Sequence, residues 1–319
     1  MSQPSLTLQS PLGARLGAWF KERFPPANAL LFFILYLTCA AVARHEFGAI
    51  GISLVDVMGC LVAWSYFLVL RIFDEHKDYQ LDLQNHPHRV LQSGLITLAH
   101  LRVLAVIAIA AQVIWSLYVD DWRLGPATQA WGLAFLWTCL MGKEFFCGAW
   151  LEKRLTLYAF SHMLVMPLLV WWLANLGASG VEASAAVLWL MAVAFASGFA
   201  FEITRKARGT DEEREGVDSY SRIFGTRGAA LVITLLVLTM GALQLALIHA
   251  LCATLPWWAW LVIGVFSVLA LDSIRRYAGN PTESARERNE GMVALLMLAG
   301  YAVTIAASLA SAPVTITLW

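Results

Sequence analysis

Residues 51–82 read GISLVDVMGCLVAWSYFLVLRIFDEHKDYQLD, and the pattern of this segment indicates the fold class. Its first part, residues 51–73, is apolar along most of its length, and a helix needs about 20 such residues to cross a bilayer. Its second part is crowded with carboxylates, namely Asp74, Glu75, Asp78 and Asp82. Charge at the end of a membrane helix is costly unless it is hydrated or used. The pattern therefore predicts a membrane protein with a functional site where this helix leaves the bilayer.

Apolar segments of similar length recur along the chain. Of all residues, 59% are hydrophobic and only 14% are charged, whereas a soluble domain has about a quarter charged residues. We expect an all-α, polytopic membrane protein with about nine spans, at residues 27–44, 51–73, 97–118, 126–146, 156–177, 183–203, 228–250, 254–274 and 290–311. These spans leave room for a short cytosolic lead-in at 1–26 and a single transmembrane domain at 27–319. The net charge is zero, which gives no electrostatic reason to expect a nucleic acid partner.

The distribution of basic residues predicts the orientation. With nine spans, one side of the membrane holds all of the 22 lysines and arginines except Arg44 and Arg123. Basic residues accumulate on the cytosolic side, so we expect a cytosolic N-terminus and an outside C-terminus, in a multi-pass protein of a bacterial inner membrane. The connections at 71–96 and 204–227 would then be cytosolic, and they are the expected active-site loops.

The four acids after the second span share one face if the helix continues through them. Successive residues of an α-helix are about 100° apart, which places all four within an arc of about 100°. Carboxylates this close repel one another and favour a bound cation. Mg²⁺ commonly binds one or two carboxylates together with substrate phosphates. The alternative is a solvated helix end with ordinary surface charge.

The next segment reads NHPHRVLQSG, residues 85–94. Pro87 ends any helix, and Ser93-Gly94 makes a turn before the third span. Arg89 is a candidate anion contact, and the two histidines read as loop residues.

The acidic segment at 74–82 and the loop at 85–94 together resemble motifs of the UbiA superfamily of intramembrane prenyltransferases. Members carry an Asn-Asp-x-x-Asp-x-x-x-Asp motif at the end of the second helix, followed by an Asn-x-Pro-x-Arg-Pro-x-x-Ser-Gly stretch. Here Asp74-Glu75 stands in place of Asn-Asp, with Asp78 and Asp82 at matching spacing. The downstream positions in register are Asn85, Pro87, Arg89, Ser93 and Gly94.

A second match lies between the fourth and fifth spans. Family members often read Tyr-x-x-Lys-Arg-x-Thr there, with the basic pair facing the diphosphate, and Lys153, Arg154 and Thr156 fit that pattern. Both basic side chains suit phosphate oxygens. Without the resemblance, a basic pair at a membrane edge usually anchors the helix and sets topology.

The second acidic motif of the family, roughly Asp-x-x-x-Asp, is altered in this sequence. Glu202 can stand for its first acid, but Arg205 and Lys206 occupy the next turn. Either these cations face the same cavity as Asp78 and Asp82 and replace a second Mg²⁺, or Glu202 simply pairs with Lys206 at the surface. A changed substrate or lost activity is a further interpretation. The acids at 211–215 and 218 read as a solvated loop.

The resemblance implies transfer of a prenyl group from a prenyl diphosphate to a lipophilic or small-molecule acceptor within the bilayer, by a transferase of alkyl groups other than methyl. The implied catalytic residues are Asp78, Asp82, Lys153 and Arg154. The implied substrate contacts are Tyr79, Asn85, Arg89, Arg205 and Lys206. The implied Mg²⁺ ligands are Asp74, Glu75, Asp78, Asp82 and Glu202.

Two alternatives stay open at this point. A cyclase of the same superfamily would ionise the diphosphate without using an acceptor. A transporter would place its binding site near the bilayer midplane, whereas the charges here gather at span ends and cytosolic loops. Asp56 and Asp272 are acids within spans, and both read as charges at the membrane interface.

Overall fold

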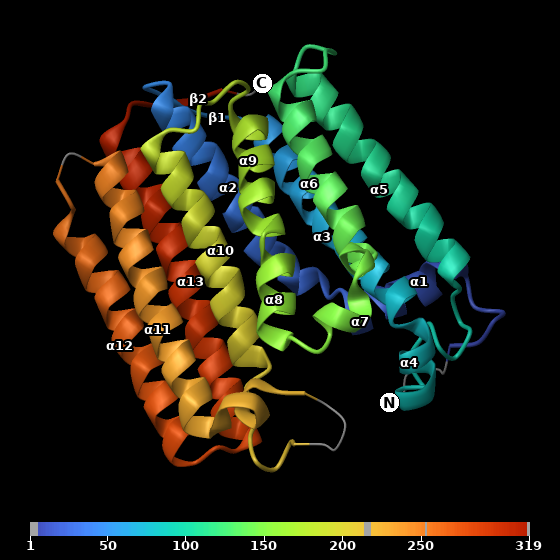
Figure 1. Cartoon of the computed structure of the whole chain (residues 1–319). Helices are drawn as coiled ribbons and strands as arrows, with labels where there is room; N and C mark the ends of the chain where they lie inside the picture. Colours follow the sequence, from blue (N-terminus) through green and yellow to red (C-terminus); the bar gives the residue numbers. More distant parts are fainter. Residues whose placement is uncertain (1–5, 214–217, 253, 318–319) are drawn as a thin grey trace, which may run out of the picture.

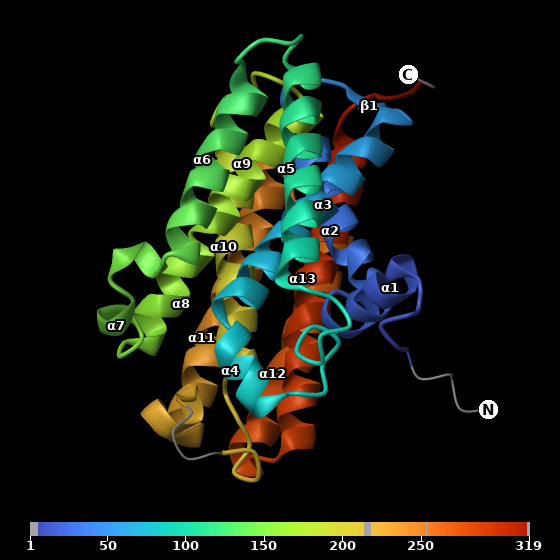
Figure 2. The same ribbon diagram turned by 90° about the vertical axis from the view of Figure 1, so that its right-hand side faces the viewer.

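The computed structural model describes residues 6–213, 218–252 and 254–317, and the chain is a bundle of long helices (Figures 1 and 2). The long helices are α2 (Ala29–Glu46), α3 (Val55–Lys77), α5 (Leu98–Val119), α6 (Pro126–Gly142), α8 (Leu155–Met163), α9 (Val165–Gly177), α10 (Ala185–Arg205), α11 (Tyr220–Leu251), α12 (Trp257–Gly279) and α13 (Glu283–Ser311). The short elements are α1 (Leu12–Arg23), η1 (Pro26–Asn28), β1 (Ile50–Ile52), α4 (Tyr79–Asn85), η2 (Glu144–Phe146), α7 (Gly148–Leu151) and β2 (Val314–Ile316). The predicted all-α, polytopic class is confirmed.

Eight helical stretches of the described chain are long and apolar enough to cross a membrane, with α8 and α9 forming one of them. The ninth expected span is α6, which has 17 residues and ends at Gly142 rather than near residue 146. At 1.5 Å per residue it is about 26 Å long, close to the thickness of a hydrocarbon core. It packs against α5 and α9 and runs alongside them, as a crossing helix would.

Three helices extend beyond the predicted spans into polar sequence. α3 continues to Lys77, and α13 begins at Glu283, where the Thr282 side chain accepts a hydrogen bond from the backbone of Ala285. α11 begins at Tyr220 and is broken at Gly225, whose φ of 68° favours glycine. Hydropathy locates the apolar part of a helix, whereas caps and breaks decide where the helix ends.

The bundle end opposite the acidic segment is closed by a buried ion pair. Arg44 donates to both carboxylate oxygens of Asp56, at 2.7 and 3.0 Å, and to the carbonyl of Gly177 at 2.9 Å. The Tyr36 hydroxyl donates to Asp56 at 3.0 Å. Asp56 is only 5% exposed, so this charge at the bundle end is enclosed by the protein and paired. The parallel pair β1–β2 lies at the same end (Figure 1).

The predicted lead-in contains a helix that packs on the bundle. α1 packs against α3 through Trp19, which is fully buried beside Leu68 and Ile72, and Phe24 just after α1 is 5% exposed. These rings share a hydrophobic cluster with Ile72 of α3 and Leu101 of α5. The N-terminal segment is therefore part of the folded structure around the acids.

Candidate active site at the end of the third helix

The acidic segment is split between two helices. α3 ends at Lys77, the backbone N–H of Asp78 still bonds to the carbonyl of Asp74 at 2.8 Å, and α4 begins at Tyr79. Asp78 has a ψ of 5°, which bends the chain between the helices. The helix does not continue unbroken through all four acids, but Arg23 contacts both Glu75 and Asp82, so these two acids still lie close together.

Glu75 and Asp82 are held by arginines. Glu75 is 1% exposed, and one of its carboxylate oxygens accepts from Arg23 Nε at 2.6 Å and from Arg71 Nη2 at 2.6 Å. Asp82 pairs with Arg89 Nη1 at 2.6 Å and with Arg23 Nη2 at 3.3 Å. Arg89, predicted to contact an anion, therefore binds an acid of the motif.

The carboxylates of Asp74 and Asp78 are exposed to solvent. The Asp74 side chain is 60% exposed, and its contact with Arg71 is long, at 4.0 Å. Within the described part of the chain, Asp78 is exposed and has no ion-pair partner. Protein atoms around Asp78 displace some of its water and raise the pKa of its carboxyl, and the charge of Asp82 adds to this effect while Lys77 opposes it. Two open carboxylates one helical turn apart fit a Mg²⁺ ion that also takes phosphate oxygens.

Three charged side chains, those of Lys77, Glu144 and Lys206, lie close to Tyr158. Lys77 at the end of α3 donates to the Tyr158 hydroxyl at 2.5 Å and pairs with Glu144 at 2.5 Å. Lys206, just after α10, places its Nζ 5.6 Å from the centre of the Tyr158 ring. Sequence reasoning missed Lys77, Tyr158 and Glu144. Lys77 was visible within the acidic segment, but Tyr158 stands in an apolar run that carries no such signal.

The altered second motif forms ion pairs within itself. Glu202 pairs with Arg205 at 2.8 Å and with Lys206 at 2.8 Å. The pairing of Glu202 with Lys206, which was the alternative to a cavity shared with Asp78 and Asp82, is therefore present. Glu202 and Arg205 nevertheless line a cavity, so their pairing is not confined to the outer surface.

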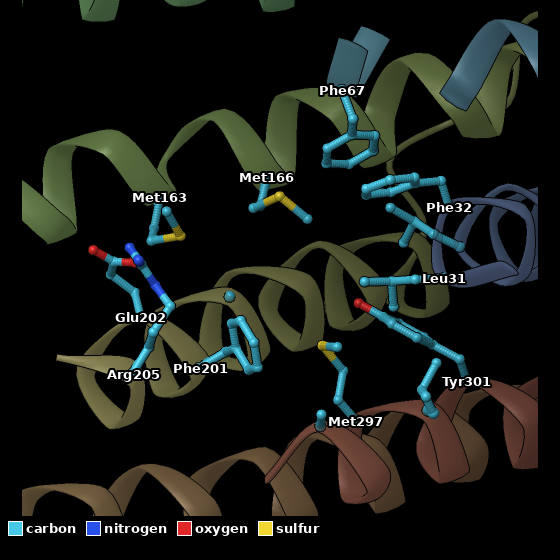
Figure 3. Close-up of a pocket in the computed structure, with 14 residues that line it drawn as sticks. Leu31, Phe32, Phe67, Met163, Met166, Phe201, Glu202, Arg205, Met297 and Tyr301 are labelled. Carbon is cyan, nitrogen blue, oxygen red and sulfur yellow. The ribbon is translucent and has the colours of Figure 1, made fainter. Parts of the chain in front are cut away.

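This cavity has a volume of about 290 Å³ and lies between α2, α3, the α8–α9 pair, α10 and α13. Figure 3 shows Glu202 and Arg205 at one end of it. The rest of the wall is apolar or aromatic, and the labelled side chains are Leu31, Phe32, Phe67, Met163, Met166, Phe201, Met297 and Tyr301. Phe32 and Phe67 stack at the end away from the charges, with ring centres 3.9 Å apart. A long apolar ligand with an anionic head matches such a cavity in shape and polarity.

The predicted catalytic residues Lys153 and Arg154 and the predicted substrate contacts Asn85 and Tyr79 lie outside this cavity wall. Lys153 and Arg154 are exposed in the loop between α7 and α8, and Arg154 lies over the Trp150 ring at 4.2 Å. Asn85 donates to the carbonyl of Leu81 at 3.0 Å, and Tyr79 packs against the cluster under α1. Their roles toward substrate stay predictions.

The acids after α10 were expected to form a solvated loop, but several of them make specific contacts. Glu212 accepts from Arg286 of α13 at 2.8 Å, and Asp211 accepts from the backbone of Glu283 at 2.9 Å. Burial would raise the pKa of Glu212, but the bond from Arg286 holds it below its usual range. Asp218 is exposed, and residues 214–215 lie outside the described residues. The described contacts tie this loop to the start of α13.

Comparison with known proteins agrees with this architecture. The sequence profile of the UbiA prenyltransferase family matches residues 30–299. A solved structure of digeranylgeranylglyceryl phosphate synthase superposes with a TM-score of 0.64 at 17% identity, over 93% of this chain and 99% of that one. The apo structure of a UbiA homolog from Aeropyrum pernix K1 superposes with a TM-score of 0.58 at 15% identity, over 87% and 96%. No curated protein matches the sequence.

Proposed function

The chain belongs to the UbiA prenyltransferase family, and on that premise we propose that it transfers a prenyl group from a prenyl diphosphate to a lipophilic acceptor, with Mg²⁺ as the cofactor. One observation carries the proposal. An apolar cavity of about 290 Å³ ends at the charged pair Glu202–Arg205, so one ligand can have its tail in the cavity and its phosphates at the bundle end.

The charges at that end suit a diphosphate. Arg205 and Lys206 supply cations from α10, and Lys77 supplies one from α3. Asp74 and Asp78 would hold the ion, which when bound neutralises the charge that grows on the leaving diphosphate. Lys153 and Arg154 are proposed to add charge-assisted hydrogen bonds to the phosphates from the α7–α8 loop.

The cavity wall has a separate task, which is to position the allylic carbon and keep water away from it. Aromatic and methionine side chains such as Phe201, Met163 and Met297 offer no hydrogen bonds to water and pack against an isoprenoid chain. Exclusion of water protects an electrophilic carbon from hydrolysis until an acceptor attacks.

The proposal is tested with the purified chain in lipid vesicles. Prenyl diphosphates of several lengths are supplied with a membrane lipid extract, and mass spectrometry follows the lipids while released pyrophosphate is counted. We expect pyrophosphate release that depends on Mg²⁺ and on the lipid extract, together with a new prenylated lipid. Release without the extract, with a cyclic hydrocarbon as the product, would instead identify a cyclase. Absence of release with every diphosphate would contradict prenyl transfer.

A further inference from the structure

The acids of the third helix are bound by a helix that precedes the family-matched region. The match begins at residue 30, whereas α1 ends at Arg23. Arg23 reaches Glu75 at 2.6 Å and Asp82 at 3.3 Å, the first and last positions of the Glu75-x-x-Asp78-x-x-x-Asp82 spacing. The two acids are thus bridged by one guanidinium.

The position of Arg23 is well supported by packing. Trp19 is fully buried, and the Phe24 ring stacks on Phe32 with centres 6.0 Å apart. Arg15 donates to the carbonyl of Leu95 at 2.8 Å. These contacts anchor the chain both before and after Arg23, so its guanidinium is held in place by the folded structure.

The local charges leave Glu75 little capacity for a metal ion. Two arginines, Arg23 and Arg71, share one of its oxygens, and its side chain is fully enclosed. The other oxygen, Oε2, is buried and has no hydrogen-bond partner in the described chain, but a divalent ion bound there would lie beside the charges of both guanidinium groups, which repel it. Asp74 and Asp78 carry no comparable partner within the described residues.

We propose that Arg23 supplies a permanent positive charge to the diphosphate site. Its guanidinium pairs with Glu75 and Asp82, so that a single divalent ion binds, at Asp74 and Asp78. This inference rests on the proposed function and adds to it the number of ions and the part played by the N-terminal helix. Arg23 acts through the acids and is a positioning residue.

The test measures metal binding rather than turnover. Mn²⁺ replaces Mg²⁺ because bound and free Mn²⁺ differ in their electron paramagnetic resonance signal, and inorganic pyrophosphate replaces the substrate head. We expect one Mn²⁺ per wild-type chain. Arg23→Gln removes the competing charge, and its Kd for Mn²⁺ should fall about tenfold. Arg23→Lys keeps a charge and should behave like the wild type.

The matched control is Lys21→Gln, which removes an exposed charge two residues earlier on the same helix. It should leave the Kd for Mn²⁺ unchanged. Two Mn²⁺ ions per wild-type chain would overturn the inference, even if no variant folded. An unchanged or weaker affinity of Arg23→Gln for Mn²⁺ would also overturn it. Equal tightening in both variants would mean a general surface-charge effect, which also overturns it. Prenyl transfer by a wild-type chain that binds two ions would leave the transferase proposal standing.

Discussion

At the end of α3, two acids pair with arginines and two remain open to solvent. The sequence predicts all four as Mg²⁺ ligands, because it carries no information on their distant partners. Arg23 is 52 positions from Glu75, and nothing in the apolar pattern of α1 links the two. The acids were therefore predictable from the sequence, whereas their division into pairs depends on how α1 packs.

Replacing Asp78 should reduce activity without disturbing the fold. Asp78→Asn keeps the size of the side chain and breaks no ion pair of the described chain, so the protein should fold and lose most of its Mg²⁺-dependent transfer. The measurement is pyrophosphate release over a Mg²⁺ titration, with thermal unfolding as the check on folding. Asp272→Asn is the matched control, since Asp272 pairs only with neighbouring arginines on exposed α12 surface. Full activity of Asp78→Asn in the presence of chelator would exclude the metal role.

Lys153 and Arg154 are predicted to bind the phosphates of the donor. Replacing either by alanine should weaken prenyl diphosphate binding by about 1.5–3 kcal/mol, the usual worth of a hydrogen bond to a charged group. Acceptor binding should change less. The control is Arg275→Ala, another exposed arginine, which lies on α12. Equal losses for donor and acceptor would indicate that the basic pair serves folding or topology instead.

At the scale of elements, hydropathy predicts the helices well and their ends less well. α3 ends at Lys77 with no proline or glycine there to mark it, and α4 restarts at once. The ion-pair partners of Asp82 lie on α1 and in the loop after α4, and they hold α4 in place. The end of α3 is therefore set by tertiary contacts, which a periodicity in one sequence does not contain.

Gly198 of α10 keeps the proposed tail cavity open. A Cβ at this position would lie 3.1 Å from the Met163 sulfur and 3.4 Å from Met166, and a larger side chain would extend into the cavity. Gly198→Phe should therefore reduce the affinity for prenyl diphosphates at least about tenfold, with a smaller effect on inorganic pyrophosphate. Equilibrium binding of the two ligands is the measurement.

Gly264→Phe provides the control for Gly198→Phe. Gly264 is exposed on α12 with nothing within 4 Å of its Cβ position, so the same substitution there should leave both affinities unchanged. Normal prenyl diphosphate binding by a folded Gly198→Phe chain would place the tail outside this cavity.

At the scale of the whole molecule, the number of crossings decides the topology. α1 packs beside the acids at the end of α3, whereas β2 lies at the other end of α3 (Figure 1), and chain ends on opposite sides of a membrane require an odd number of crossings. Eight stretches of the described chain meet the length and composition of a span, so α6 must also cross for the two ends to be separated by a membrane. The hydropathy of the sequence predicts the nine crossings. The cavity, in contrast, is lined by residues from five separate stretches and is not predictable from any one of them.

The orientation follows from the basic residues, and fusions to reporter proteins test it. We expect a cytosolic N-terminus because all of the 22 lysines and arginines except Arg44 and Arg123 then face the cytosol. Green fluorescent protein fused after Trp319 should stay dark in a bacterial host, since it does not fold when exported through the membrane unfolded, whereas alkaline phosphatase at the same point should be active. The matched fusion after Asn280, at the end of α12, should give the reverse result because it removes the last crossing. Fluorescence of the full-length fusion would contradict the predicted topology, either because the whole chain is inverted or because α6 does not span the membrane.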